Sequence, residues 1–349
     1  MAQGPVKGSR TWRLALGGLL ALALLGFFFR GLDWAALRNA FAHARWGYLA
    51  GVALLTLVMY VARAWRWGLL LRPLAEVPLA RTFSATVVGF MAGLVIPRAQ
   101  EVLRPYLVAR RHDLRTSAAF ASIIVERLLD LITVLILFGL YLFVLPRPAQ
   151  QTQGPLMATA QQVGLLAGVG ALGVLALLIA FHWHAEPILA FCDRQLARLP
   201  ERIARPAAAL LRSFGEGLAI FKAPPSLLLA IFAQSFVVWL LIALSLHCTN
   251  LAFGLTLPFH ATFVMLVFLT VGVAVPTPGM VGGFHAAYLL ALTQAFGVER
   301  ETAAAAGIAA HALSNLPVLL CGLALLPGEG LTLGGVAELT DKQAEEKDP

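Results

Sequence analysis

Long apolar runs alternate with short polar segments along most of the chain. About 20 apolar residues in a helix are needed to cross a hydrocarbon core of about 30 Å. We interpret six of these runs as full membrane spans: residues 14–29, 47–71, 117–145, 154–181, 226–247 and 302–326. The pattern therefore predicts an all-α polytopic membrane protein with about six full transmembrane helices.

Two further apolar runs are shorter, and a proline follows each of them. Residues 83–96 precede Pro97, and residues 259–275 precede Pro276. The first run would form about 21 Å of helix, which is too short to cross the membrane. We predict that each run is one arm of a re-entrant helical hairpin that turns inside the protein. A pair of tilted full spans is the alternative for each hairpin.

The order of elements in the first half returns in the second half. Each half has a full span, a half-helix that ends at a proline, a returning arm and a last span with polar residues inside it. This order predicts an inverted-topology repeat, with residues 47–145 as the first repeat and 226–326 as the second. Both belong to a single membrane domain, residues 1–326. The first hairpin is expected to open on the cytoplasmic side and the second on the outer side.

The polar segments orient this domain. The basic segment 1–13 favours a cytoplasmic N-terminus. Between the repeats, arginines at helical spacing predict an interfacial basic helix over residues 187–222, lying on the cytoplasmic leaflet. The tail 327–349 has six acidic residues and two lysines, so we expect it to be disordered, with the C-terminus also cytoplasmic.

Composition and charge agree with a membrane protein. Hydrophobic residues make up 59% of the 349 residues and charged residues 13%, against about 25% in a typical soluble domain. The net charge of +8 lies in short loops, where basic residues contact lipid head groups, so nucleic acid is not an expected partner. The three cysteines form no CxxC pair, and we expect no metal and no cofactor.

Charged residues interrupt the apolar pattern of the first half. Glu126, Arg127 and Asp130 lie within the run 117–145, where an ionisable residue costs about 2.5 to 3.5 kcal/mol to insert. They therefore need a polar site inside the membrane. Arginines suit a lipid phosphate, and the carboxylates suit a cationic head group or a coupling proton. The alternative is that the charges only neutralise one another, Glu101 with Arg104 and Arg127 with Asp130, both at i, i+3 spacing.

The returning arm of the second half contains glycines and histidines. The glycines after Pro276 could let the backbone approach a phosphate, or could only permit a tight turn and close packing. His285 and His311 are candidates for the substrate pathway or for proton exchange, although a hydrogen-bonded packing role suits each of them as well. The predicted substrate-binding residues are Arg98, Glu101, Arg104, Glu126, Arg127, Asp130, Pro276, Pro278, Gly279, Gly282, Gly283, His285 and His311.

Arg63 and Arg66 lie one turn apart near the end of the run 47–71, next to Trp65 and Trp67. Arginine near a helix end, flanked by tryptophan, usually extends to the membrane interface. We interpret both arginines as interfacial, with substrate contact as the alternative.

Three segments give the chain a family resemblance: IPRAQEVLRPY, AAFASIIVERLLDL and VPTPGMVGGFHAAY. Over roughly residues 12–326 it resembles the flippase-like transmembrane region of lysylphosphatidylglycerol synthases, although Gln100 stands where that family usually has glycine. In synthases a soluble aminoacyl-transferase domain follows, and none follows in this sequence. The resemblance implies a bacterial or archaeal inner-membrane protein that moves a phospholipid or polyprenyl-linked lipid between leaflets by alternating access.

Two other functions stay open at this point. One is a membrane enzyme with Glu101 or Glu126 as a base, although the sequence has no HExxH or GxSxG motif. The other is an accessory protein of lipid or hopanoid biosynthesis, with a lipid-modifying enzyme as partner. We expect a transporter without catalytic activity.

Overall fold

The computed structural model describes residues 19–26, 28–146, 155–184 and 218–332, together with isolated positions between 190 and 216. All regular structure in these residues is helical, which confirms the all-α prediction. The α-helices are α2 (Trp34–Ala42), α3 (Trp46–Leu71), α4 (Leu79–Val95), α5 (Ala99–His112), α6 (Thr116–Phe143), α7 (Pro155–Trp183), α10 (Pro225–Ala252), α11 (Ala261–Ala274), α12 (Gly283–Phe296) and α13 (Arg300–Leu325). The 3-10 turns are η1 (Leu218–Lys222), η2 (Pro278–Met280) and η3 (Pro327–Glu329).

Three helices of the described chain are long and apolar enough to cross a membrane: α3, α10 and α13. Helix α6 is as long as α10, at 28 residues, but its charged residues Glu126, Arg127 and Asp130 interrupt the apolar sequence. The total of about six spans and the inverted repeat stay predictions.

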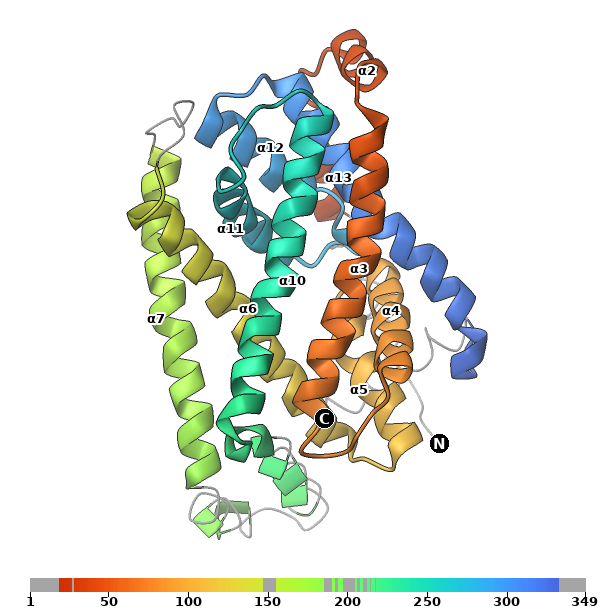
Figure 1. Cartoon of the computed structure of the whole chain (residues 1–349), viewed down its shortest axis with the longest axis vertical. Coiled ribbons are helices and arrows are strands. Elements are labelled where there is room, and N and C mark those ends of the chain that lie inside the picture. Colours follow the sequence, from red (N-terminus) through yellow and green to blue (C-terminus); the bar gives the residue numbers. More distant parts are fainter. Residues whose placement is uncertain are drawn as a thin grey trace, which may run out of the picture.

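Two pairs of short helices lie at the positions of the two predicted hairpins, and their re-entrant course stays a prediction. Helices α4 and α5 pack together in one half of the molecule, and α11 and α12 pack together in the other half (Figure 1). The long helices α3 and α10 run side by side past both pairs, and α13 contacts both α4 and α12. Each hairpin thus packs against longer helices.

The turns of the two hairpins meet. Arg98, at the turn between α4 and α5, donates to the backbone oxygen of Ala274 at the end of α11, at 3.5 Å. Gly279, in the turn η2, lies against the backbone oxygen of Leu94. Both Arg98 (φ 64°) and Gly279 (φ 62°) have left-handed backbone conformations, which let the chain reverse sharply.

Glycines explain the close packing within each hairpin, in two different ways. On α4, a Cβ at Gly89 would lie 2.5 Å from Cγ of Arg104, so a side chain of α5 occupies the space. Between α11 and α12 the backbones themselves touch. A Cβ at Gly272 would lie 2.6 Å from the oxygen of Gly283, and a Cβ at Gly283 would lie 2.3 Å from the oxygen of Gly272.

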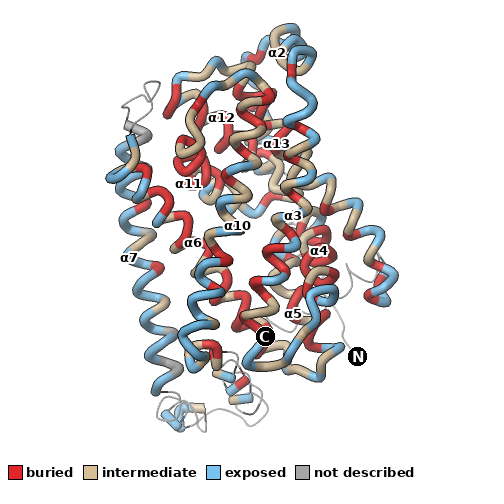
Figure 2. Tube along the Cα trace, viewed as in Figure 1, coloured by how far each residue is buried: buried red, intermediate tan, exposed pale blue. Residues whose placement is uncertain are grey.

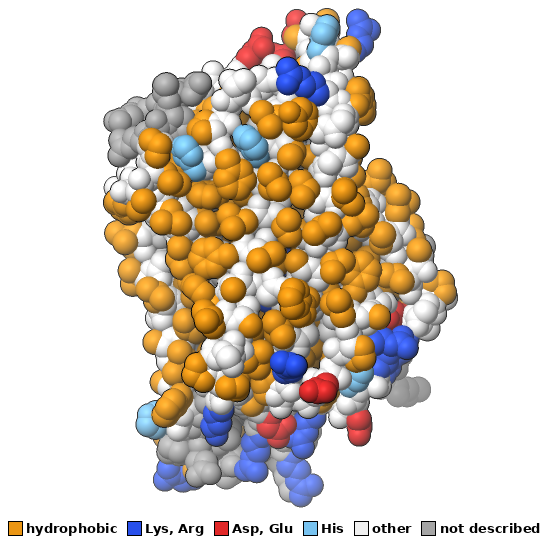
Figure 3. Space-filling model, in the orientation of Figure 1, with side chains coloured by type: hydrophobic (Ala, Val, Ile, Leu, Met, Phe, Trp, Pro, Cys, Tyr) orange, Lys and Arg blue, Asp and Glu red, His pale blue; other side chains and the backbone are white. Residues whose placement is uncertain are grey.

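The surface has the distribution expected in a membrane. Buried positions gather where the short helices meet the long ones, and exposed positions follow α7 (Figure 2). Hydrophobic side chains cover the middle of the visible face, and charged side chains gather at its two ends (Figure 3). Trp46 and Trp65, near opposite ends of α3, are 67% and 54% exposed, as in the aromatic belts of membrane proteins.

The segment after α13 corrects one prediction. Disorder was expected from residue 327, but Glu329 in η3 is only 2% exposed. Its carboxylate accepts from Ser84 at 2.5 Å and forms an ion pair with Nε of Arg111 at 3.1 Å, and Arg110 donates to its backbone oxygen at 2.6 Å. Residues 333–349 lie outside the described residues. Most of the predicted basic helix, 187–222, lies outside them too and stays a prediction.

Candidate functional site

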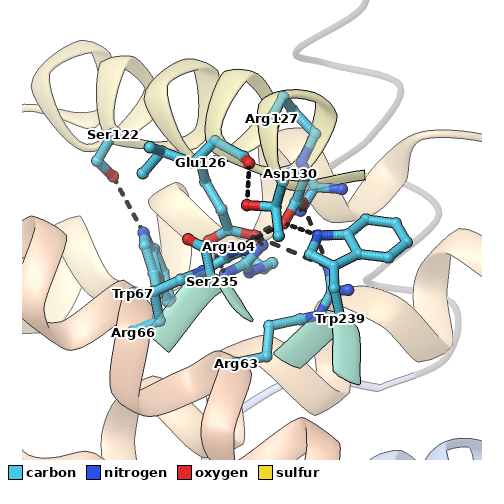
Figure 4. A network of polar contacts seen from close by, with 12 residues as sticks. Arg63, Arg66, Trp67, Arg104, Ser122, Glu126, Arg127, Asp130, Ser235 and Trp239 are labelled. Carbon is cyan, nitrogen blue, oxygen red and sulfur yellow. Dashed lines mark hydrogen bonds and ion pairs between the residues drawn. The ribbon is translucent and has the colours of Figure 1, made fainter. Parts of the chain in front are cut away.

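Two carboxylates of α6 are buried between the helices of the first half. Glu126 is fully buried and Asp130 is 5% exposed. They lie one helical turn apart, so both carboxylates face α3, α5 and α10 (Figure 4). This confirms that α6 carries charge into the protein interior.

Arg104 of α5 makes the strongest contact with these acids. Its two terminal nitrogens donate to the two oxygens of Glu126, at 3.0 and 2.9 Å. The guanidinium is fully buried and lies over the ring of Trp67, with its carbon 4.4 Å from the ring centroid. A bidentate pair of this kind is strong and directional, so it fixes α5 against α6.

Helix α3 supplies two more arginines, which the sequence analysis placed wrongly at the membrane interface. Arg66 is fully buried and donates to Asp130 at 2.7 Å and to Ser235 of α10 at 3.1 Å. Arg63 is 6% exposed and lies 3.9 Å from both Glu126 and Asp130. Only Trp65, on the other face of α3, points outward as the interfacial interpretation required.

The fourth arginine, Arg127, is the most accessible of the cluster. It forms ion pairs with Glu126 and, at 3.2 Å, with Oδ2 of Asp130, and its side chain is 38% exposed. Trp239 of α10 closes the other side of Asp130, since its indole N–H donates to Oδ1 at 2.9 Å. Neither Trp239 nor Ser235 was predicted from the sequence as a site residue.

We name this group the charged cluster: Arg63, Arg66, Arg104, Glu126, Arg127 and Asp130. Four arginines (+4) and two carboxylates (−2) give it a formal net charge of +2. Glu101 is half-buried and interacts electrostatically with Arg127, without a direct contact among the described interactions. Arg98 lies apart, exposed at the hairpin turn. The structure thus joins four of the six predicted first-half residues.

The predicted residues of the second half form a separate group around the turn of α11 and α12. The rings of His285 and His311 lie 4.5 Å apart. His311 contacts the backbone oxygen of Gly279 through Nε2 at 2.8 Å, and the N–H of Gly282 donates to Nδ1 of His285 at 3.4 Å. Pro276 is exposed, and Pro278 begins η2.

The glycines of this turn have packing roles in the structure. Gly282 has φ 87°, and a Cβ there would lie 2.6 Å from Cβ of Leu24 in the N-terminal helical segment. Gly283 lies against the backbone of α11. The tight turn and close packing that the sequence analysis offered as an alternative are therefore present. Substrate binding by these residues stays a prediction.

Within the described part of the chain, no three histidine, cysteine or acidic side chains gather where they could hold a metal ion. The charged cluster offers guanidinium and carboxylate groups for ion pairing and hydrogen bonding.

A protein-family model described as "Lysylphosphatidylglycerol synthase TM region" matches residues 14–322. The match includes both hairpins and the charged cluster. Comparison with curated proteins and with solved structures found no match.

Proposed function

Because the chain belongs to the family of lysylphosphatidylglycerol synthase transmembrane regions, which are lipid-related membrane proteins, we propose that it moves lipid head groups between leaflets. In this proposal the protein is a flippase-like transporter of a phospholipid or a polyprenyl-linked lipid. It acts by alternating access and does not change the lipid chemically.

The observation that carries the proposal is the charged cluster itself. Five of the six ionisable groups are buried among apolar helices, which is expensive, and residues of this kind in membrane proteins usually mark a substrate or ion pathway. Arg104 comes from the short hairpin, whereas the other five groups come from the long helices α3 and α6. A displacement of the hairpin would separate Arg104 from Glu126 and open the cluster.

The hairpins support alternating access. Helix α4 has 17 residues and α11 and α12 have 14 each, about 26 and 21 Å of helix. These lengths fall short of a core of about 30 Å, which favours re-entrant arms over full spans. The arms lie in opposite halves of the molecule, and their turns meet. Each hairpin would gate one side of the membrane, with both chain termini in the cytoplasm.

The same geometry argues against an enzyme that uses Glu126 as a general base. Both oxygens of Glu126 accept hydrogen bonds from arginines, and the carboxylate is fully buried. A base must reach the proton that it removes. Glu126 is held in a structural ion pair instead, so transport fits its environment better than catalysis.

The test is a leaflet-exchange assay in proteoliposomes with fluorescent zwitterionic, anionic, aminoacylated and polyprenyl-linked lipids. We expect protein-dependent exchange of one lipid class, lost in Glu126→Gln. Glu76→Gln, at an exposed position between α3 and α4, is the matched control and should keep full exchange. Mass spectrometry of the recovered lipid must show an unchanged mass. A new product, or equal exchange in liposomes without protein, would refute the proposal.

A further inference from the structure

The sequence left open whether the cluster binds a cationic head group through its carboxylates or an anionic one through its arginines. The structure shows how far each carboxylate is already occupied. The two oxygens of Glu126 accept from Arg104, and Arg127 also contacts Oε1. Oδ1 of Asp130 accepts from Arg66 and Trp239. An incoming cation would have to displace these donors.

The arginines, in contrast, keep free donors. The Nε atoms of Arg63, Arg66, Arg104 and Arg127 are buried without a hydrogen-bond partner. One carboxylate oxygen, Oδ2 of Asp130, also lacks a hydrogen bond, but it lies 3.2 Å from Arg127. The cluster therefore has more unpaired hydrogen-bond donors than unpaired acceptors, in agreement with its net charge of +2. Buried donors without acceptors are unfavourable.

We propose that the charged cluster recognises an anionic phosphate of the lipid head group, prefers a dianionic phosphomonoester or diphosphate, and rejects cationic aminoacyl head groups. The inference rests on the proposed function in taking the ligand to be a membrane lipid. A dianion would bring the cluster to neutrality, whereas a cationic head group would raise its charge to +3. In a site of low dielectric constant this difference is larger than it would be in water.

Arg127 and Arg63 are the residues that would meet the phosphate. Both lie next to the same oxygen, Oδ2 of Asp130, at 3.2 and 3.9 Å. The side chain of Arg127 is 38% exposed, so an anion can approach from its side. Arg63 has the longest ion-pair distances of the four arginines, so it has the most to gain from a new partner. Arg104 and Arg66 hold the carboxylates and position the site.

The test measures binding alone, with the full-length protein in uncharged detergent micelles. The probes are dihexanoyl phosphatidate, dihexanoyl phosphatidylcholine and a dihexanoyl trimethylammonium lipid without phosphate. Trp67 and Trp239, which contact the cluster, provide the fluorescence signal. We expect phosphatidate to bind at least roughly tenfold more tightly than phosphatidylcholine, and the cationic lipid to bind most weakly. Equal affinities, or tightest binding of the cationic lipid, would overturn the proposal.

The variants separate this cluster from the charge of the whole protein. Arg63→Gln lowers the cluster from +2 to +1 and should reduce the preference for phosphatidate about tenfold, whereas Arg63→Lys should keep most of it. Arg38→Gln, at an exposed position on α2, lowers the total charge equally and should change nothing. If Arg38→Gln and Arg63→Gln reduced the preference for phosphatidate equally, the assignment of the anion site to the charged cluster would be refuted. Melting temperatures establish that each variant folds. If Arg63→Gln does not fold, Arg127→Gln takes its place in the test.

Failure of this inference is distinguishable from failure of the proposed function. A preference for phosphatidate without leaflet exchange would leave the anion site standing and refute transport. Exchange of a cationic lipid alone would support transport and refute the anion site.

Discussion

The pair of Arg104 and Glu126 allows a quantitative test of how charge holds the helical core together. Removing one partner of a buried ion pair costs about 3 to 5 kcal/mol, because the other charge is left uncompensated. Glu126→Gln removes the acid that contacts Arg104 and Arg127 and lies 3.5 Å from Arg66. Since the cluster then carries a net charge of +3, we expect Glu126→Gln to lower the free energy of unfolding by about 4 to 5 kcal/mol, the upper part of that range.

Arg104→Met should lower the free energy of unfolding by less than Glu126→Gln does. Methionine retains much of the volume packed against Trp67 and Phe90, and Glu126 keeps its contact with Arg127. The net charge falls to +1, so the two remaining carboxylates still face three arginines. We expect a loss of about 3 kcal/mol, at the lower end of the range for a broken buried pair.

The double variant separates charge balance from simple loss of contacts. Arg104→Met combined with Glu126→Gln returns the cluster to +2. We expect a total loss of about 4 to 5 kcal/mol instead of the additive 7 to 8, which is a coupling of about 3 kcal/mol. Reversible unfolding in mixed micelles with increasing sodium dodecyl sulfate, followed by tryptophan fluorescence, gives all four stabilities. A double variant within about 0.5 kcal/mol of the additive value would show that the two residues act independently and refute the reasoning.

Three further changes test single contacts, the first two by the same unfolding assay and the third by proteolysis. Gly89→Ala places a Cβ 2.5 Å from Cγ of Arg104 and should lower the free energy of unfolding by about 2 kcal/mol. Gly139→Ala, with open space around it, should not lower it. Equal effects of the two changes would contradict the packing at Gly89. Trp239→Phe removes the hydrogen bond to Asp130 and should cost about 1.5 to 3 kcal/mol, and the same change at exposed Trp46 should stay within about 0.5 kcal/mol. Glu329→Gln should weaken η3 and speed tryptic cleavage after Arg111; an unchanged cleavage rate would refute its role.

The helices were predictable because most of their apolar runs are long, and because a proline follows each of the two short runs. Pro97 and Pro276 follow α4 and α11 as expected. The predicted boundaries differ where a helix continues through polar residues that hydropathy does not count. Helix α10 extends past His247 because Thr249 and Asn250 are buried, and Asn250 accepts from Tyr288 at 3.0 Å. Such a partner comes from a distant segment and leaves no local signal.

The candidate site was predictable in part. Glu126 and Asp130 stood out because a charge within an apolar run needs a counter-charge. The counter-charges Arg63 and Arg66 were assigned to the interface, because periodicity alone does not say which face of α3 points inward. A usable signal existed: two buried acids require cations, and α3 carries two arginines one turn apart. Trp239 had no such signal, since tryptophan is common on lipid-facing surfaces as well.

The glycine contacts make the two hairpins mechanically different. Between α11 and α12 the contact at Gly272 and Gly283 is backbone against backbone, and backbone atoms have no rotamers with which to adjust. We expect that hairpin to move as one stiff body. Between α4 and α5 the space at Gly89 holds the side chain of Arg104, whose position depends on its ion pair with Glu126. We therefore expect the first hairpin to be the more compliant one, and a change of charge at the cluster to alter its shape.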